Sequence, residues 1–335
     1  MPIFDHAGDY VAGAAGSVKA LFVNPGSFLS PAPLVVALII AGAAIALRRH
    51  KSGAQFNLQA LLRALFPASV WKHVSTRHDA AIILINEGLL FFLTASAAML
   101  VAPLAIGVAE LAGAETRLLN PPSTNFWMLA LFGLYFALAW DFMNTYAHYL
   151  KHKVPLLWEF HKVHHCAEVL TPLTALRRHP VEIIASSLIT GSGMALAVII
   201  WALVFGAPGK AHEVGGAVGL VYLWRLLGYN IRHSHVWISY GPFWNRFLMS
   251  PAHHQLHHSR EPRHYDCNFG HIFTFWDRLF GTLYQPVEGE VFELGIEREE
   301  NEKLRTLSAL YFRPLKKAAE RFAPQRRPLA APPAE

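Results

Sequence analysis

The sequence is poor in cysteine and in charged residues, and each scarcity argues against a class of protein. Only two cysteines, Cys166 and Cys267, occur in 335 residues, so a disulfide framework is excluded, and no C-x-x-C pair is present for a thiolate zinc site. Charged residues make up 16% of the chain, whereas soluble domains carry about a quarter. The first residues show no basic stretch leading into an apolar run and a small-residue cleavage site, so a cleaved signal peptide is not expected.

Hydrophobic residues are abundant instead, at 53% of the chain, and they gather in long runs. A bilayer core about 30 Å thick requires about 20 consecutive apolar residues in a helix. Five runs are predicted to span a membrane: 33–47, which is short and borrows flanking residues, 80–108, 126–147, 183–205 and 214–229.

The distribution of Lys and Arg predicts how these spans are oriented. The segments after the first and third runs are rich in basic residues, whereas the loops after the second and fourth runs hold only Arg117 and Lys210. Cytoplasmic loops carry the excess of Lys and Arg, so the N-terminus is expected outside and the long C-terminal region in the cytoplasm. The net charge of +6 therefore belongs to loops beside apolar runs. No basic stripe indicates a nucleic-acid partner.

Nineteen histidines occur, and eight of them form three clusters. The first is the H-x-x-x-H pair His148 and His152. Two H-x-x-H-H motifs follow: His161, His164 and His165, and then His254, His257 and His258. Residues three and four apart lie on one helix face, so each cluster is expected to present its imidazoles in one direction.

This residue type in this number indicates a metal centre. Neutral imidazole binds iron, copper, zinc and nickel, and eight imidazoles exceed the four ligands of a structural zinc ion. Two ions sharing the set is the simplest arrangement. The first two clusters precede the fourth predicted span and the third follows the fifth, so an even number of crossings brings all three to the cytoplasmic face.

Several polar residues near the clusters are candidates for supporting roles. His233 stands at a span end and could complete a coordination sphere, while His179 and His235 are expected further out. Asp141 and Asn144 share a helix face with His148. An ionisable residue inside a span is costly and usually functional, so Asp141 could orient a ligand imidazole; simple helix packing is the alternative.

These motifs together resemble the fatty acid hydroxylase and sterol desaturase superfamily. The resemblance runs over residues 125–285 and rests on D-F-M-N-T-Y-A-H at 141–148, W-E-F-H-K-V-H-H at 158–165, R-H-P at 178–180, S-P-A-H-H-Q-L-H-H-S at 250–259, D-C-N-F-G at 266–270 and W-D-R-L-F-G-T at 276–282. His235, after Ser234, departs from the Asn more often expected there.

The resemblance implies a membrane enzyme that uses two iron ions and O2 to hydroxylate or desaturate a sterol, a fatty acyl chain or a related lipid. It implies nine ligands: His148, His152, His161, His164, His165, His233, His254, His257 and His258. Two electrons would have to come from a separate ferredoxin- or cytochrome-type donor. Such enzymes reside in the endoplasmic reticulum or the bacterial inner membrane, and the bacterial location is expected here.

The predicted fold is an all-α polytopic bundle of about five spans, with a cytoplasmic helical cap that carries the histidine clusters. Residues 1–124 form an arm and two spans, 125–285 the catalytic region, and 286–335 an amphipathic helix at 302–322, which could lie on the membrane surface, and a disordered tail. Two alternatives stay open. One is a metal-binding or metal-transporting membrane protein, although transporters place their ligands at mid-membrane. The other is a zinc hydrolase with Glu159 or Glu168 as base.

Overall fold

The computed structural model of the chain describes residues 7–24, 27–88, 107, 110, 125–206 and 219–322. These residues form helices and loops with two isolated β-bridges, which confirms the predicted all-α class. Three described helices are long and apolar enough to cross a membrane: α2 (Pro31–Lys51), α8 (Phe126–Lys153) and α10 (Pro180–Phe205).

The other two predicted spans lie partly outside the described residues. Helix α5 (Val74–Gly88) covers the beginning of the run at 80–108, and α12 (Gly219–Arg232) covers most of the run at 214–229. A total of five spans therefore stays a prediction. The three described spans are longer than predicted because polar residues extend their ends, as in α2, whose last turn holds Arg48, Arg49, His50 and Lys51.

Helix α8 carries the first histidine pair within its last turns. Its first turn is capped by Asn125, whose side chain accepts a hydrogen bond from the backbone N–H of Met128 at 2.9 Å. The helix continues past residue 147, the predicted end, to Lys153. Because the apolar run and the histidine pair belong to one helix, His148 and His152 sit at the end of a candidate span.

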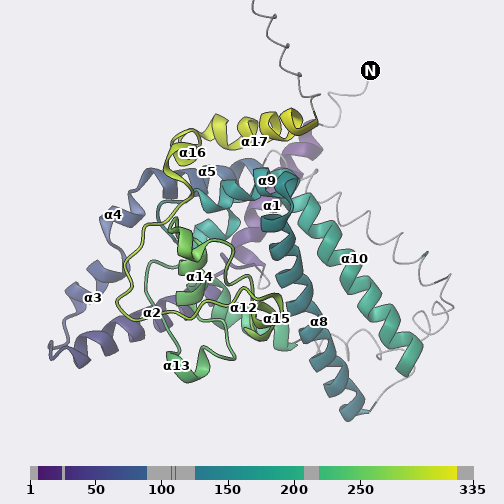
Figure 1. The fold of residues 1–335 in the computed structure, drawn as a ribbon, viewed down its shortest axis with the longest axis horizontal. Helices are drawn as coiled ribbons and strands as arrows, with labels where there is room; N and C mark the ends of the chain where they lie inside the picture. Colours follow the sequence, from purple (N-terminus) through teal and green to yellow (C-terminus); the bar gives the residue numbers. More distant parts are fainter. Residues whose placement is uncertain are drawn as a thin grey trace, which may run out of the picture.

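Helix α10 runs beside α8, and the two project from the rest of the molecule (Figure 1). Trp201 of α10 packs against Phe132 and Tyr135 of α8, with ring centroids 5.1 and 5.4 Å apart. The Tyr135 hydroxyl also donates to the Ala197 carbonyl at 2.8 Å. At the other end of the pair, Lys151 Nζ of α8 lies 3.0 Å from Glu182 Oε1 in the first turn of α10, so the beginning of α10 lies close to the end of α8.

The segment between these two spans carries the second cluster. Helix α9 (Pro155–His165) begins directly after α8, and the 3-10 helix η1 (Pro172–Leu176) leads into α10. The third cluster lies on α14 (Pro251–His257), which packs against α12. The remaining helices are α1 (Ala7–Val23), α3 (Leu58–Leu65), α4 (Ala68–Trp71), α13 (Gly241–Trp244), η2 (Pro262–His264), α15 (Phe275–Phe280), α16 (Arg298–Glu302) and α17 (Leu307–Phe322).

The amphipathic segment predicted at 302–322 divides into the end of α16 and all of α17. Leu310, Pro314 and Ala318 are buried on the face of α17 that packs against α9 and α5, whereas Phe312 and Phe322 are exposed. Contact of the exposed face with a membrane stays a prediction, and the predicted disordered tail lies outside the described residues.

A buried arginine fixes the end of α9. The Nε of Arg177 donates to the Val163 carbonyl at 2.7 Å, and its Nη1 pairs with Asp79 Oδ1 of α5 at 3.0 Å. Asp79 also accepts from the Thr174 hydroxyl at 2.7 Å. All these side chains are buried, so α5, α9 and η1 are held together next to His164 and His165.

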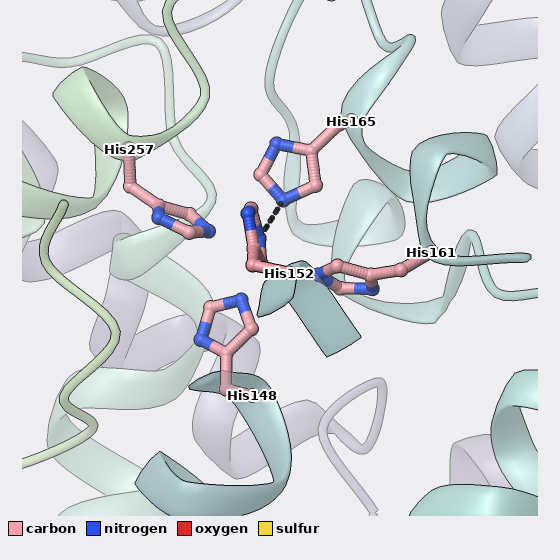
Figure 2. A group of neighbouring side chains, drawn as sticks. All are labelled: His148, His152, His161, His165 and His257. Carbon is pink, nitrogen blue, oxygen red and sulfur yellow. Dashed lines mark hydrogen bonds between the residues drawn. The ribbon is translucent and has the colours of Figure 1, made fainter. Parts of the chain in front are cut away.

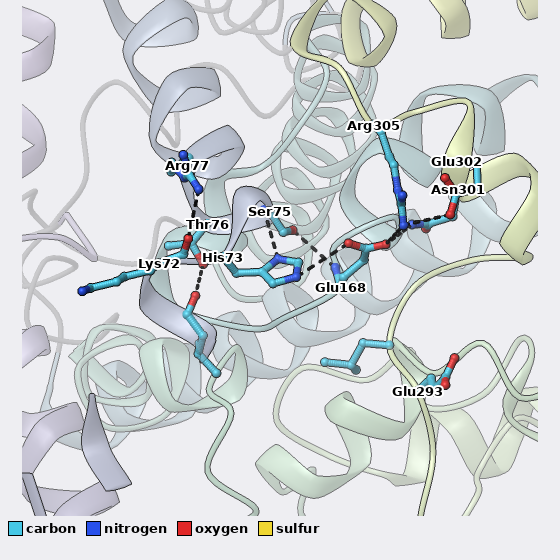
Figure 3. Close-up of polar contacts among 12 residues, drawn as sticks. Lys72, His73, Ser75, Thr76, Arg77, Glu168, Glu293, Asn301, Glu302 and Arg305 are labelled. Carbon is cyan, nitrogen blue, oxygen red and sulfur yellow. Dashed lines mark hydrogen bonds and ion pairs between the residues drawn. The ribbon is translucent and has the colours of Figure 1, made fainter. Parts of the chain in front are cut away.

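A second network holds the segment that follows His165, at the end of α9 (Figure 3). The backbone N–H of Glu168 donates to the Ser75 hydroxyl at 3.3 Å. The Glu168 carboxylate accepts from Asn301 Nδ2 at 3.1 Å and lies 3.5 Å from Arg305 Nη2. The segment that follows His165 is therefore fastened both to α5 and to α16.

Candidate metal centre

All nine histidines predicted as ligands lie in two compact groups. The five-histidine group contains His148 and His152 of α8, His161 and His165 of α9, and His257 of α14. The four-histidine group contains His164 of α9, His233 after α12, His254 of α14 and His258, which caps the end of α14. Within each group one nitrogen per ring lies within 4.8 Å of every other, close enough for one ion.

Each H-x-x-H-H motif contributes to both groups, so the expectation that a cluster presents all its imidazoles in one direction is wrong. His161 and His165 face one group and His164 the other. Residues four apart on a helix differ by about 40° in direction, whereas a residue three along turns about 60° the other way. The second motif repeats the division, with His254 and His258 in one group and His257 in the other.

Figure 2 shows the rings of the five-histidine group converging from three helices. The Nε2 atoms of His152 and His165 are 3.1 Å apart. Backbone carbonyls orient two further rings, since His148 Nδ1 donates to Phe269 O at 3.0 Å and His257 Nδ1 donates to Cys267 O at 2.6 Å. These contacts leave Nε2 as the free ligand atom of both rings.

Carboxylates orient two other rings of this group. His161 Nδ1 lies 2.9 Å from Glu182 Oε1, and His152 Nδ1 lies 3.3 Å from Asp266 Oδ1. A carboxylate on the far nitrogen of a ligand imidazole fixes its tautomer and raises its basicity. The five-histidine group therefore receives negative charge through its ligands.

The four-histidine group is built differently. Its Nε2 atoms lie in a chain of short contacts: 3.2 Å from His164 to His233, 2.8 Å from His233 to His254, and 3.2 Å from His254 to His258. The Nδ1 atoms of all four rings are buried without a partner among the described residues. No carboxylate of the described chain supports these rings, so the two groups differ in electrostatic support.

The burial of the rings suits metal binding. Desolvation, together with neighbouring imidazoles and cations, holds the pKa of His161, His164, His233, His254 and His257 well below its ordinary value. Burial likewise lowers the pKa of His258 to about 3. Neutral imidazole is the form that binds metal. The Nε2 atoms of His161 and His257 are buried with no partner in the part of the chain that the structure describes, an arrangement that a cation would satisfy.

The two glutamates that could serve a zinc hydrolase are occupied elsewhere. Glu159 pairs with Lys162 and accepts from Arg321 Nη2 at 2.7 Å. Glu168 belongs to the network with Asn301 and Arg305 (Figure 3). In the described part of the chain neither joins a histidine group, so neither of these two glutamates is placed to act as the base of a hydrolase.

The four residues predicted for supporting roles lie at different distances from the centre. Asp141 does not hold a ligand imidazole: its carboxylate accepts from the backbone N–H of Ile272 at 2.8 Å and from Trp276 Nε1 at 2.9 Å. It instead fixes the segment that follows Phe269. Asn144 donates to the Trp140 carbonyl at 2.7 Å and lines a cavity beside the groups.

His179 and His235 have structural partners. His179 caps α10 by accepting from Val181 N at 3.1 Å, and its Nε2 donates to Tyr311 O at 3.0 Å. His235 Nε2 donates to Ala64 O at 2.9 Å. Both stand outside the two groups.

Three residues at the centre were missed by the sequence reasoning. Glu182 follows the R-H-P motif by two positions, and an acidic residue in the first turn of an apolar helix was the available signal. Asp266 belongs to a motif that was recognised without a role. His271 directly follows that motif, and its ring lies 6.1 Å from that of His148.

Two cavities reach the histidines. The inner cavity, about 260 Å³, lies among α8, α10 and α12 and touches His148, His161, His164, His233 and His254. The outer cavity, about 610 Å³, is lined by Trp158, Tyr265 and Ile296 and touches His152, His165 and His257. The centre is therefore accessible both from between the candidate spans and from the side of α9 and α16.

Comparison with known proteins identifies the region that carries these groups. Residues 133–282 match the family model described as fatty acid hydroxylase. Alkylglycerol monooxygenase of Homo sapiens is 29% identical over 53% of this chain and 35% of its own length. The Delta(7)-sterol 5(6)-desaturase erg3C of Aspergillus fumigatus is 31% identical over 48% of this chain and 50% of its own length.

A bacterial relative shows the same coverage. Ornithine lipid hydroxylase OlsE of Rhizobium tropici is 25% identical over 50% of this chain and 44% of its own length. The chain thus spans half or less of the length of these curated relatives. No solved structure matches the chain. The resemblance predicted from the sequence motifs is confirmed.

Proposed function

Because residues 133–282 belong to the fatty acid hydroxylase family, we propose that this protein is an O2-dependent lipid hydroxylase or desaturase with two iron ions. The observation that carries the proposal is the division of nine buried histidines into two groups of five and four. Each group contains enough imidazole donors to bind one ion, so the two groups together can hold two ions. The relatives named above act as monooxygenase, desaturase and hydroxylase, and this supports an oxidoreductase.

The chain's own residues supply position and charge. When bound, a pair of iron ions supplies the reductive activation of O2 needed to oxidise an unactivated C–H bond. Phe269 O and Cys267 O hold two ligand rings in one tautomer, and Glu182 and Asp266 hold two others. The desolvated surroundings keep the rings outside the spans neutral, so they stay available as ligands at physiological pH.

We propose the inner cavity as the substrate site. Its walls continue along α8 through Asn144 and Trp140, and along α10 through Ser186 and Thr190. Both helices are candidate spans, so a lipid can reach the histidines from within the bilayer. The membrane face is proposed to be cytoplasmic, on the distribution of Lys and Arg. The membrane is proposed to be the bacterial inner membrane, one of the two locations that the family resemblance implies.

We propose that electrons arrive from a separate donor protein at the outer cavity. Trp158 lines this cavity, and its ring centroid lies 4.9 Å from that of His152 and 5.5 Å from that of His165. The cavity also exposes Asp266, Glu297 and Glu300 at its wall. An aromatic ring in contact with two ligand rings gives a short path from a docked donor to the five-histidine group.

Lipid profiling under isotopic oxygen tests the proposal. Membranes of cells that contain the wild-type protein, and of cells that contain His257→Ala, are extracted after growth under ¹⁸O2. A lipid that carries ¹⁸O, or one that has lost two hydrogens, should accumulate only with the wild type. Normal ion import in the wild type without any new lipid would favour the metal-transport alternative and contradict the proposal.

A further inference from the structure

An arginine with unsatisfied donors faces the inner cavity beside the four-histidine group. Arg232, at the end of α12, is 5% exposed and directly precedes His233. Its Nη1 reaches the His271 carbonyl at 3.5 Å, while Nε and Nη2 are buried with no acceptor among the described residues. A buried guanidinium keeps its charge, and a buried charge is costly unless it is paired.

The rest of the cavity adds positive charge. Lys151, Arg178 and Arg225 also line it, and Glu182 is the one carboxylate among its described lining residues. Glu182 Oε1 already accepts from Lys151 Nζ at 3.0 Å and from His161 Nδ1, and it lies 3.5 Å from Arg178 Nε. Four basic side chains therefore face one acid, and Arg232 has no counter-ion among the described residues that line the cavity.

The other nearby acids are committed to backbone N–H groups. Asp141 accepts from Ile272 and Phe273, and Asp277 accepts from Phe269 and Gly270 at 2.7 Å each. Neither of these two acids lies within ion-pair distance of Arg232. A bound anion would therefore meet an unpaired donor set, as required for a charge-assisted hydrogen bond.

The inner cavity is elongated along α8 and α10. His148, Asn144 and Trp140 on α8 line it at four-residue intervals, and Glu182, Ser186 and Thr190 on α10 do the same. Eight residues of helix extend about 12 Å. The cavity thus leads from the histidines and Arg232 along two candidate spans, so a headgroup at the histidine end would direct its acyl chain along the spans.

We propose that Arg232 binds an oxyanion, a carboxylate or a phosphate, in the headgroup of the lipid substrate. This inference rests on the proposed function and deepens it. With the oxyanion at Arg232, the next few bonds of the lipid lie against His233 and His254, so the carbon that is oxidised lies close to the headgroup. The substrate class is then an acidic or zwitterionic lipid rather than a neutral sterol.

Binding of three amphiphiles with one chain length tests the inference without turnover. Hexadecanoate, hexadecyl phosphate and hexadecanol compete with a fluorescent fatty acid for the metal-loaded protein in maltoside micelles. The wild type should prefer one or both anions to the alcohol by roughly tenfold or more, the scale of a hydrogen bond to a charged group. Arg232→Gln should lose this preference, while Arg178→Gln, an equal charge change in the same cavity, should keep most of it.

Several outcomes would overturn the inference. Equal binding of alcohol and anions by the wild type would do so, as would a preference that Arg232→Gln retains. Competition by inorganic phosphate alone would show a free anion and no lipid headgroup. If Arg232→Gln does not fold, Arg232→Lys replaces it, because this variant keeps the charge with fewer donors. Its preference for the anions over the alcohol should be weaker than that of the wild type. A preference equal to that of the wild type would contradict the assignment. Anion-selective binding without an O2-dependent product would leave this site standing and refute the proposed function.

Discussion

The Nδ1 atom of His161 lies 2.9 Å from Oε1 of Glu182. A carboxylate in the first turn of α10, one candidate span, therefore orients a histidine of α9, the helix that follows α8, another candidate span. Both side chains are buried. Because Glu182 also pairs with Lys151 of α8, one carboxylate joins α8, α9 and α10 at the point where the five-histidine group forms. The metal centre is thereby coupled to the packing of the spans.

Replacing this carboxylate should weaken one group selectively. In Glu182→Gln the side-chain carbonyl can still accept from His161, but the charge is lost, so affinity for metal in the five-histidine group should fall about 10- to 100-fold. Metal titration of the purified protein measures this. Glu168→Gln, a carboxylate away from the groups, serves as the control, and an equal loss there would contradict the assignment. Addition of Lys151→Gln tests whether the uncompensated lysine is the cause.

A methyl group at residue 270 should disturb the same site. A Cβ at Gly270 would lie 2.7 Å from Phe273 O and 2.8 Å from Asp277 Oδ2, too close without a backbone shift. That shift moves Phe269 O, the acceptor for His148. Gly270→Ala should therefore reduce metal occupancy, whereas Gly219→Ala, which meets nothing within 4 Å, should not. Equal occupancy in both variants, measured by metal analysis, would argue against this support.

Breaking the buried ion pair between Asp79 and Arg177 should destabilise the packing of α5, α9 and η1. Asp79→Asn leaves the buried Arg177 without its counter-charge, and loss of one partner of such a pair costs about 3–5 kcal/mol. The Arg305→Gln variant, which removes more exposed pairs with Glu302 and Glu168, should cost at most about 1 kcal/mol. Thermal unfolding in detergent compares the two, and similar midpoints would contradict the structural role of Arg177.

The docking of α17 should weaken in acid. Burial raises the pKa of Glu300, but hydrogen bonds from Arg313 and Lys162 outweigh it and bring the pKa to about 2. The pKa of Glu300 in the unfolded chain is 4.5. The stabilisation that the Glu300 carboxylate contributes is therefore complete above pH 4.5 and is lost as the pH falls toward 2. After allowance for partial exposure it is worth roughly 1–2 kcal/mol.

Hydrogen exchange of residues 307–322 between pH 5 and 3 measures this effect. Exchange corrected for its intrinsic pH dependence should rise with acid in the wild type and already be raised in Glu300→Gln. Glu299→Gln, at an exposed neighbouring position, provides the control. A flat wild-type profile would show that the contacts of Glu300 do not hold α17.

Much of the site could be predicted because its ligands are close in sequence. Eight of the nine histidines stand in motifs of three- and four-residue spacing, His233 stands at a span end, and the apolar runs around them predict which ones share a membrane face. The division of each motif between two groups was not anticipated, because it depends on how α9 and α14 are rotated about their axes. Motif spacing alone does not give that rotation.

The supporting residues were harder to predict because their partners are distant in sequence. Asp266 reaches His152 across 114 positions, and Arg232 faces a cavity assembled from three helices. Asp141 lies inside a predicted span beside the first histidine pair, whereas Glu182 lies one residue before a predicted span, so Asp141 attracted a role that Glu182 holds instead. Polarity inside a span signals function, but only the packing shows which imidazole a carboxylate touches.

The central claim, two ions held by separate histidine groups, is tested most directly by counting metal in matched variants. The wild-type protein purified with iron should contain about two ions per chain by this ligand arithmetic. His257→Ala and His258→Ala, one substitution in each group, should each retain about one, while His50→Ala, an exposed histidine outside both groups, should retain both. One ion in the wild type, or equal occupancy in all four proteins, would contradict the account.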